Sequence, residues 1–379
     1  MNTSWDDWFA ERADARDAAG LTRSLVPHGP DEPVLDLAGN DYLGLARHPR
    51  VREAAAEAAR TWGAGAGASR LVTGTLAVHT DLERALTDFL GWPAALVTST
   101  GYHANLSVVT ALADRSALVV SDAHIHASLI DAARLSRAEI VVVPHNDVDA
   151  VRAALTGADG RRALVLAESV YSVLGDAAPL AALVAACAEH DALLVVDEAH
   201  GLGLRGPHGD GLVRELGLAG HPNVVVTATL SKALGAQGGA VLGSPALVDH
   251  LVNTARPFIF DTALAPSPAA AALEALRVLR EQPDLATLVH RRVAELGRAL
   301  GVDDLPAGAV LSVPMPTPQV AVAAQAACLA HGVRVGCFRP PSVPDGVSRL
   351  RITVGAGLGD ADWAQAVDVI TRVVKEHTG

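Results

Sequence analysis

Lysine is rare in this chain, and one of its two lysines stands in a segment suited to chemistry. The 379 residues hold 28 arginines but only Lys232 and Lys375, and Lys375 lies four residues from the end. The segment Thr229-Leu-Ser-Lys232-Ala-Leu-Gly235 follows a β-branched run and combines hydroxyls with glycine, which lets a backbone approach a ligand and bind phosphate oxygens. A lysine held among cationic or apolar groups can lose its proton and form a Schiff base. The alternative interpretation is a surface lysine beside a glycine-rich turn.

A second segment supplies an acid at the end of an apolar strand. Asp197 follows Leu193-Leu-Val-Val, and His200 comes three residues later. Pyridoxal phosphate needs an acid against its pyridine nitrogen so that the ring can absorb electrons, and Asp197 suits that role, with His200 within reach of the ring hydroxyl. The string Asp-Glu-Ala-His also names a helicase box, but the chain has no GxxxxGK[ST] loop for nucleotide phosphates. A metal site at Asp197 and His200 would lack a third ligand at helical spacing, so we expect no metal.

Three more polar segments follow strands. Ser99-Thr-Gly101-Tyr102 opens a helix, whose unpaired amides at Gly101 and Tyr102 could hold a phosphate; a simple helix cap is the alternative. His126 could stack on an aromatic cofactor, although a lone histidine there is more often structural. Ser172 ends the segment Glu168-Ser-Val-Tyr-Ser and could contact a cofactor oxygen.

The elements that must position these residues form an α/β pattern. Short β-branched runs alternate with Ala/Leu-rich stretches from about residue 93 to 243, which predicts a mostly parallel sheet covered by helices. Ligands bind beyond the carboxyl ends of such strands, so the five segments should meet in one crevice. The predicted strands are 94–98, 117–121, 139–143, 163–168, 192–196, 223–227 and 239–243.

Outside this core the regular alternation of strands and helices ends. An amphipathic helix at 4–19, a strand at 34–37 and a helix from Pro49 precede it, and Pro257, Pro266 and Pro268 break the chain after it. A helix at 268–281 leads to a smaller α+β region, which begins with a helix from about residue 285. It continues with helices at 318–331 and 361–376 and strands at 309–313, 333–336 and 348–353. We therefore expect an N-terminal segment at 1–40, a large cofactor-binding domain at 41–265 and a small C-terminal domain at 266–379.

Composition limits the partners. The net charge of −12 opposes an extended phosphate-binding surface, so nucleic acid is not an expected partner. Cys187, Cys328 and Cys337 are odd in number and lack a CxxC spacing, which indicates a reducing compartment. No apolar run reaches the roughly 18 residues that span a bilayer, and the start of the chain lacks a signal-peptide pattern. We expect a soluble, cytoplasmic protein with no membrane partner.

The motifs, taken together, resemble those of the α-oxoamine synthases, which are pyridoxal-phosphate enzymes of fold type I within the class II aminotransferase superfamily. The resemblance runs from about residue 34 to 353, in the family's order. It rests on these strings: Asn40-Asp-Tyr-Leu-Gly-Leu45, Gly101-Tyr102 through Asn105, His126-Ala-Ser-Leu, Pro144-His-Asn-Asp147, Glu168-Ser-Val-Tyr-Ser172, Asp197-Glu-Ala-His200-Gly, Thr229-Leu-Ser-Lys232-Ala, Ala255-Arg-Pro-Phe-Ile-Phe260 and Phe338-Arg-Pro-Pro-Ser-Val-Pro344.

The resemblance implies roles for single residues. Lys232 would bind pyridoxal 5'-phosphate covalently and act as acid and base, Asp197 would contact the pyridine nitrogen, His200 the ring oxygen, and His126 would stack on the ring and touch substrate. Four further residues would hold the cofactor: Gly101, Tyr102, Ser172 and Thr229. Three would bind substrate: Arg23, Ser342 and Arg351, the last at an amino-acid carboxylate, which a guanidinium fork suits. The family works as homodimers, so Thr262 would reach the partner's phosphate.

The resemblance also implies a reaction. The Arg339-Pro-Pro-Ser-Val-Pro344 string favours the branch that condenses L-alanine with pimeloyl-CoA, or a pimeloyl carrier protein, in biotin biosynthesis, with loss of carbon dioxide. Other branches remain alternatives, among them 2-amino-3-ketobutyrate ligase and other acyl-CoA acyltransferases. A non-catalytic binding protein that kept the fold is the alternative of another class.

Overall fold

The computed structural model describes residues 4–18, 21–23, 25–340, 343 and 345–378, and the chain forms two compact units, Met1–Val34 and Leu35–Gly379. The first unit contains helix α1 (Trp5–Ala18), which matches the helix predicted at 4–19. None of its side chains is buried. Its apolar character comes from Trp5, Trp8 and Phe9, whose ring centroids lie 5.4–6.1 Å apart.

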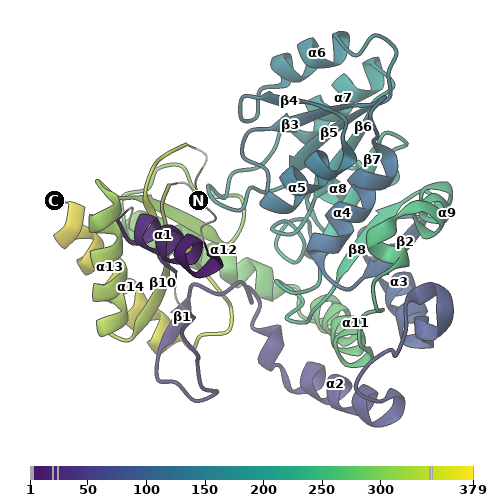
Figure 1. The fold of residues 1–379 in the computed structure, drawn as a ribbon. Coiled ribbons are helices and arrows are strands. Elements are labelled where there is room, and N and C mark those ends of the chain that lie inside the picture. The colour runs from purple at the N-terminus through teal and green to yellow at the C-terminus, as the bar shows by residue number, and fades with distance from the viewer. Residues whose placement is uncertain (1–3, 19–20, 24, 341–342, 344, 379) are drawn as a thin grey trace. The chain divides into compact units, whose positions relative to one another are not determined.

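A seven-stranded sheet organises the second unit (Figure 1). Its strand order is β2-β8-β7-β6-β5-β3-β4, and β8 alone runs antiparallel to the other six strands. Continuous Val/Leu/Ala runs form the central strands because these are buried on both faces. All seven predicted strands are confirmed, with ends shifted by two residues or fewer: β2 (Ala94–Thr98), β3 (Leu118–Asp122), β4 (Glu139–Val143), β5 (Ala163–Glu168), β6 (Leu193–Asp197), β7 (Val224–Thr229) and β8 (Gly239–Gly243).

Helices connect and cover these strands, as a parallel sheet requires. Pro257 and Pro266, predicted to break the chain, instead stand in the first turns of helices, where a missing amide costs nothing. The helices of this part are α2 (Pro49–Trp62), α3 (Ala77–Leu90), α4 (Gly101–Leu112), α5 (Ala127–Ser136), α6 (Val148–Thr156), α7 (Leu180–Glu189), α8 (Leu212–Glu215), α9 (Pro245–Thr254), α10 (Arg256–Ile259) and α11 (Pro266–Glu281), with a 3-10 turn at Leu45–Arg47 and a π-helical turn at Arg70–Gly74.

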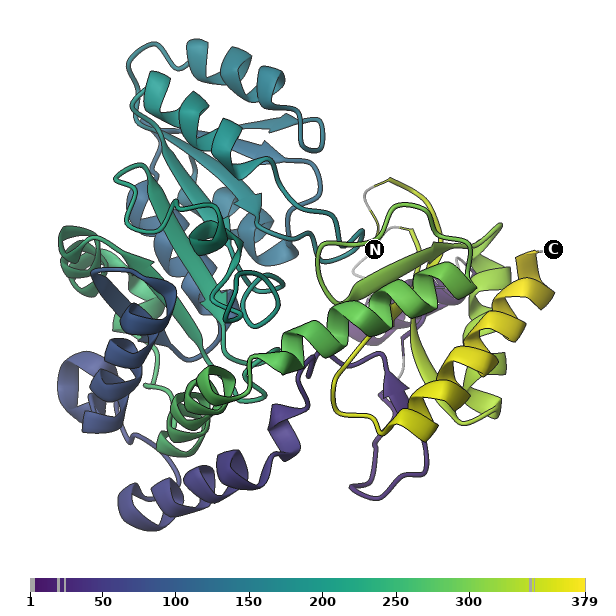
Figure 2. The ribbon, with the colours of Figure 1, turned by 180° about the vertical axis from the view of Figure 1, so that it is seen from behind.

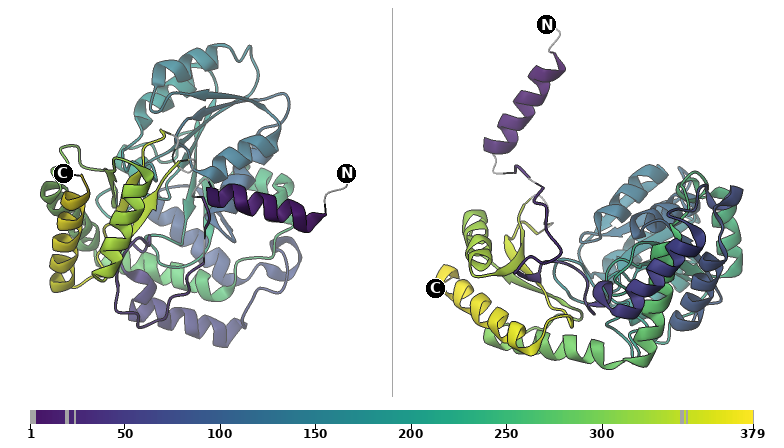
Figure 3. Two further views of the ribbon diagram at one scale, coloured as in Figure 1. Left: turned by 60° about the vertical axis from the view of Figure 1, so that its left-hand side comes forward. Right: turned by 90° about the horizontal axis from the view of Figure 1, so that it is seen from below.

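A second, four-stranded sheet combines residues from both ends of the second unit. Its order is β1-β10-β11-β9, and β1 pairs in parallel with β10. Figure 2 shows α11 and α12, in green, following one another from the large sheet to the small one, and Figure 3 shows α13 and α14 beside it. The bounds are β1 (Leu35–Leu37), α12 (Asp284–Ala299), β9 (Val310–Pro314), α13 (Pro318–Ala330), β10 (Val333–Phe338), β11 (Arg349–Thr353) and α14 (Asp360–Thr378).

The domain boundaries predicted from the sequence remain a proposal. The pairing of β1 with β10 puts residues 35–37 in the sheet of the C-terminal region, although they precede the large sheet in the chain. In the described part of the chain, no helix is long and apolar enough to cross a membrane.

An ionic anchor fixes the loop that leaves β5. His145 binds Asp122 through Nδ1 at 2.9 Å and Asp176 through Nε2 at 2.8 Å, while its ring stacks on His124 and meets the edge of Tyr171. Hydrogen bonds to these two carboxylates outweigh burial and raise the pKa of His145 to about 9. The imidazolium therefore holds Asp176, and with it the loop, at neutral pH.

We expect the anchor to make stability depend on pH. Because the pKa of His145 is raised in the folded protein, its contribution is complete below pH 6.5 and is lost as the pH rises through about 9. The free energy of unfolding of the unchanged protein should fall by on the order of 2–3 kcal/mol over that interval relative to a His145→Gln variant. Urea unfolding at several pH values measures the difference, and parallel pH profiles for the two proteins would contradict it.

Candidate active site

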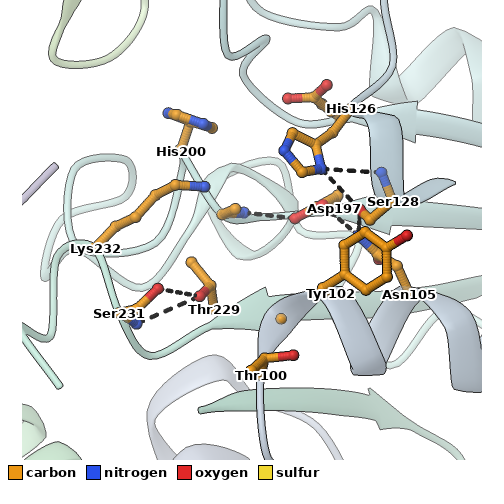
Figure 4. A pocket seen from close by; sticks show the side chains of 13 residues that line it. Thr100, Tyr102, Asn105, His126, Ser128, Asp197, His200, Thr229, Ser231 and Lys232 are labelled. Atoms are coloured by element: carbon orange, nitrogen blue, oxygen red, sulfur yellow. Dashed lines mark hydrogen bonds between the residues drawn. The ribbon is translucent and has the colours of Figure 1, made fainter. Parts of the chain in front are cut away.

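A pocket of about 250 Å³ lies where β5, β6 and β7 end and where α4 and α5 begin. Parallel strands bring their carboxyl ends to one edge of the sheet, which is why residues far apart in sequence meet here. The lining residues are Thr100, Gly101, Tyr102, Asn105, His126, Ser128, Glu168, Asp197, Ala199, His200, Thr229, Ser231 and Lys232. Figure 4 shows Lys232, Asp197 and His126 directed into the same space.

Lys232 supplies a half-buried lysine side chain to the pocket. Lys232 stands three residues after the end of β7, in a turn closed by a hydrogen bond from the Gly235 amide to the Lys232 carbonyl. Burial lowers the pKa of Lys232, and the positive charge of Arg351 lowers it further, against the opposing effects of Asp197 and Glu168. The amine is thus easier to deprotonate than an exposed lysine, which is what a nucleophile or base requires.

Asp197 is the last residue of β6 and is 6% exposed. Its Oδ1 accepts the Ala199 amide at 2.9 Å, and its Oδ2 accepts Asn105 Nδ2 at 2.8 Å. Asn105 is itself fixed, because its Oδ1 accepts the Thr227 hydroxyl at 2.6 Å. The carboxylate is therefore held in one orientation with both oxygens engaged.

Two histidines flank the carboxylate and the amine. His126 precedes α5, and its Nδ1 accepts the Ser128 amide at 3.2 Å and meets the Ser128 hydroxyl at 2.8 Å. Burial lowers the pKa of His126, and burial lowers the pKa of His200 well below its ordinary value. Both rings are thus neutral at pH 7 and can serve as apolar faces or as neutral hydrogen-bond partners.

The first turn of α4 lines the part of the pocket that suits an anion. The Thr100 hydroxyl caps the helix by accepting the His103 amide at 3.1 Å, and Gly101 is the first helical residue. The Thr229 hydroxyl lies beside it and bonds to Ser231 at 2.7 Å. A Cβ at Gly101 would come within 2.9 Å of the Thr229 Cβ, so only glycine leaves this turn room.

Gly239, at the start of β8, supports that turn from behind. A Cβ here would overlap the Thr100 carbonyl and lie 2.7 Å from the Gly101 Cα, and backbone cannot yield as a flexible side chain does. We expect Gly239→Ala to lower the free energy of unfolding by about 1–3 kcal/mol and to weaken pyridoxal-phosphate binding. Urea unfolding and a cofactor titration measure the two effects.

Gly65→Ala is the matched control, because a Cβ at Gly65 meets nothing within 4 Å. Unchanged cofactor affinity in Gly239→Ala would show that the turn does not bind the phosphate.

The structure brings most of the predicted residues together, with four exceptions. Ser172 does not line the pocket; its amide donates to Glu168 at 3.1 Å and its carbonyl accepts Arg351 Nε at 2.9 Å. Arg351 lies behind this loop and is 5% exposed. Arg23 belongs to the first unit, and Ser342 lies outside the described residues, so their substrate contacts stay predictions.

Sequence reasoning assigned no role to several lining residues, among them Asn105 and Glu168. Asn105 stands four residues after Gly101, a helical spacing that puts both on the pocket side of α4 and could have pointed to it. Glu168 ends β5 as Asp197 ends β6, and the two residues pair in the sheet register. Burial and the Asp197 charge raise the pKa of Glu168 to about 8, which keeps its carboxyl largely neutral near pH 7.

Comparison with known proteins defines the class. The model of the aminotransferase class I and II family matches residues 32–370, so the chain belongs to that family. Two curated relatives are both 8-amino-7-oxononanoate synthases. The protein of Mycolicibacterium gilvum (strain PYR-GCK) is 56% identical over 367 residues, covering 97% of each chain, and that of Mycolicibacterium smegmatis is 56% identical, covering 97% of this chain and 96% of its own.

A solved structure confirms the predicted fold type. Serine palmitoyltransferase of Sphingomonas wittichii superposes with a TM-score of 0.90 at 30% identity, covering 98% of each chain. The matched neighbours also include an SPT structure with a PLP internal aldimine. The prediction of a pyridoxal-phosphate enzyme of mixed α/β fold is therefore confirmed.

Proposed function

We propose that this chain catalyses the decarboxylative condensation of L-alanine with a pimeloyl thioester to give 8-amino-7-oxononanoate, a step of biotin biosynthesis. The observation that carries the proposal is the pocket itself, which is lined both by Lys232, whose pKa is lowered, and by the hydrogen-bonded carboxylate of Asp197. The identity of 56% to two synthases of this reaction supports the substrate assignment over the other branches.

The residues present fit pyridoxal phosphate at both ends of the pocket. The first turn of α4 and the hydroxyls of Thr100, Thr229 and Ser231 suit a phosphate, since helix N-termini and hydroxyls bind anions. Asp197 suits a protonated pyridine nitrogen. When bound, the cofactor supplies an electron-accepting ring that stabilises negative charge on the substrate α-carbon.

Lys232 would hold the cofactor through its Nζ and would move a proton at the substrate α-carbon. When L-alanine is bound, the amine would take the α-proton. Its lowered pKa suits both tasks, because an unprotonated amine is needed each time. Lys232 would also return a proton to the α-carbon once carbon dioxide has left.

Asp197 and the two histidines hold the reacting groups. The Asp197 carboxylate would face the pyridine nitrogen, and the hydrogen bond from Asn105 orients this carboxylate. His126 would pack against the ring and the substrate, and His200 would bind the ring oxygen. An acid beside the pyridine nitrogen would keep the ring a strong electron acceptor.

The substrate carboxylate is assigned to Arg351, with Ser342 and Arg23 as further substrate contacts. A guanidinium carries a planar set of donors matched to a carboxylate. In this structure Ser172, Asn40 and Thr353 accept from Arg351, so the side chain would have to turn part of this set toward the substrate. Ser172, whose backbone carbonyl positions Arg351, would contact the cofactor.

We further propose a cytoplasmic homodimer with active sites at the interface. Among the described residues, Leu71, Val72 and Phe260 are 52%, 74% and 69% exposed, and a second copy would cover them. Thr262 would reach the partner's phosphate. All three cysteines are unpaired, as suits a reducing compartment. Light scattering of the purified protein tests the dimer.

Release of the acyl donor's thiol tests the function. L-alanine, glycine and serine should each be assayed against pimeloyl-CoA, acetyl-CoA and succinyl-CoA, and the pimeloyl carrier protein should be assayed as a second donor. We expect turnover with L-alanine and a pimeloyl thioester, and formation of carbon dioxide in equal amount. A preference for glycine with acetyl-CoA would assign the chain to another branch, and a yellow protein without any turnover would favour a binding protein.

A further inference from the structure

We propose that Tyr42 fixes which nitrogen of His200 carries the proton, so that His200 meets the cofactor as a hydrogen-bond donor through Nε2. The inference rests on the proposed function, because it concerns what His200 presents to the ring oxygen. Tyr42 is a positioning residue here, since it acts through His200 and does not line the pocket.

A short buried contact joins the two residues. The Tyr42 hydroxyl lies 2.6 Å from His200 Nδ1, and the two residues are 0% and 4% exposed. A neutral imidazole carries one proton, on either Nδ1 or Nε2. Either the tyrosine donates to a bare Nδ1, or Nδ1–H donates to the tyrosine oxygen, and only the first arrangement leaves the proton on Nε2.

The neighbours of Tyr42 decide between these arrangements. Among the residues that the structure describes, the other acceptor within reach of its hydroxyl is Asn40 Oδ1, at 3.3 Å. That oxygen already accepts both Nη1 and Nη2 of Arg351, each at 3.2 Å, and an amide oxygen has two lone pairs. With Asn40 occupied, the tyrosine proton is directed to His200.

Arg351 is held firmly enough to impose this order. Its Nε donates to the Ser172 carbonyl at 2.9 Å and its Nη1 to the Thr353 hydroxyl at 3.1 Å. A guanidinium only donates, so it cannot reverse the direction of these bonds. Arg351 therefore donates to Asn40, and Tyr42 donates to His200.

The arrangement matters because the ring oxygen of pyridoxal phosphate carries negative charge in the bound cofactor. An Nε2–H donor stabilises that oxygen, whereas a bare Nε2 would leave two acceptors facing each other in a buried site. Burial supports a neutral ring, because it lowers the pKa of His200 well below the ordinary value. Of the two neutral tautomers of His200, Tyr42 thus selects the one that can donate a hydrogen bond through Nε2.

Nitrogen-15 NMR of the imidazole groups tests the proposal on the protein labelled with [15N]histidine, with and without pyridoxal phosphate. His200→Gln identifies the His200 signals. We expect a protonated Nε2 and a bare, hydrogen-bonded Nδ1. Tyr42→Phe should abolish the hydrogen-bond shift of Nδ1 and populate both tautomers, and Arg351→Gln should shift the population the same way by freeing Asn40.

Tyr171→Phe is the matched control, because Tyr171 is 1% exposed and its ring packs against His145 instead. It should leave the His200 signals unchanged. A proton on Nδ1 in the unchanged protein, or an unaltered tautomer in Tyr42→Phe, would overturn the proposal.

Kinetics give a second readout. Tyr42→Phe should lower kcat about tenfold, the effect of one misdirected buried hydrogen bond, and should change the KM for L-alanine less than about twofold. Equal losses of bound cofactor and of activity, with the tautomer unaltered, would show a merely structural role. The NMR result does not depend on turnover, so a wrong substrate assignment would leave it standing.

Discussion

Lys232→Ala should abolish covalent cofactor attachment and lower turnover by at least about three orders of magnitude. Lys232 is the only lysine in the pocket and the only one away from the C-terminus, so no other amine can replace it. Arginine stays protonated and cannot serve as the nucleophile. The yellow absorbance of the bound cofactor should disappear, and borohydride should no longer fix the cofactor to the protein.

Lys375→Ala is the control for this experiment, since Lys375 lies in the last turn of α14. It should keep the absorbance and the activity of the unchanged protein. Borohydride labelling of Lys232→Ala, or activity within tenfold of the original, would refute the assignment of Lys232.

Asp197→Asn should lower kcat by on the order of 100-fold or more, because the pyridine nitrogen loses the charge that keeps it protonated. The change also disturbs a fixed pattern of donors. Asp197 Oδ1 accepts the Ala199 amide, so the new NH₂ group would face Asn105 Nδ2, another donor. Asn105 cannot simply flip, because its Oδ1 accepts the Thr227 hydroxyl. Stopped-flow kinetics and the cofactor spectrum measure the effect.

Asp122→Asn separates this electronic effect from the cost of altering a buried aspartate. Asp122 also ends a parallel strand and is 7% exposed, but it binds His145 and does not line the pocket. We expect reduced stability with an unchanged cofactor spectrum. If both variants altered the spectrum equally, Asp197 would have no special place at the ring.

Local patterns in the sequence were enough to predict the large sheet. Its strands are continuous apolar runs bounded by polar residues, so their ends could be read to within two residues. Lys232, Asp197, His126 and His200 line the pocket, and they were predicted because each stands at the end of such a strand or in the turn after it. Pro257 was misjudged because a proline marks the first turn of a helix as well as its end.

The remaining features depend on contacts between distant residues. Nothing near Tyr42 in the sequence shows that its hydroxyl meets His200, 158 residues later. The burial of Arg351 behind the Ser172 loop likewise arises only when the two sheets come together. Asn105 was quoted as part of a motif, yet its hydrogen bond to Asp197 follows from packing of α4 against the end of β6.

The pairing of β1 with β10 sets the time at which the site can be completed during synthesis. Leu35 pairs with Val333, which comes 298 positions later in the chain. At roughly 5–20 residues per second, the ribosome needs roughly 15–60 s to make the second partner after the first. Asn40 and Tyr42 directly follow β1, so their final positions depend on the same late pairing, whereas Lys232 and Asp197 are made before β10. A nascent chain could thus form the large sheet and the part of the pocket suited to phosphate well before the hydrogen bond between Tyr42 and His200 forms.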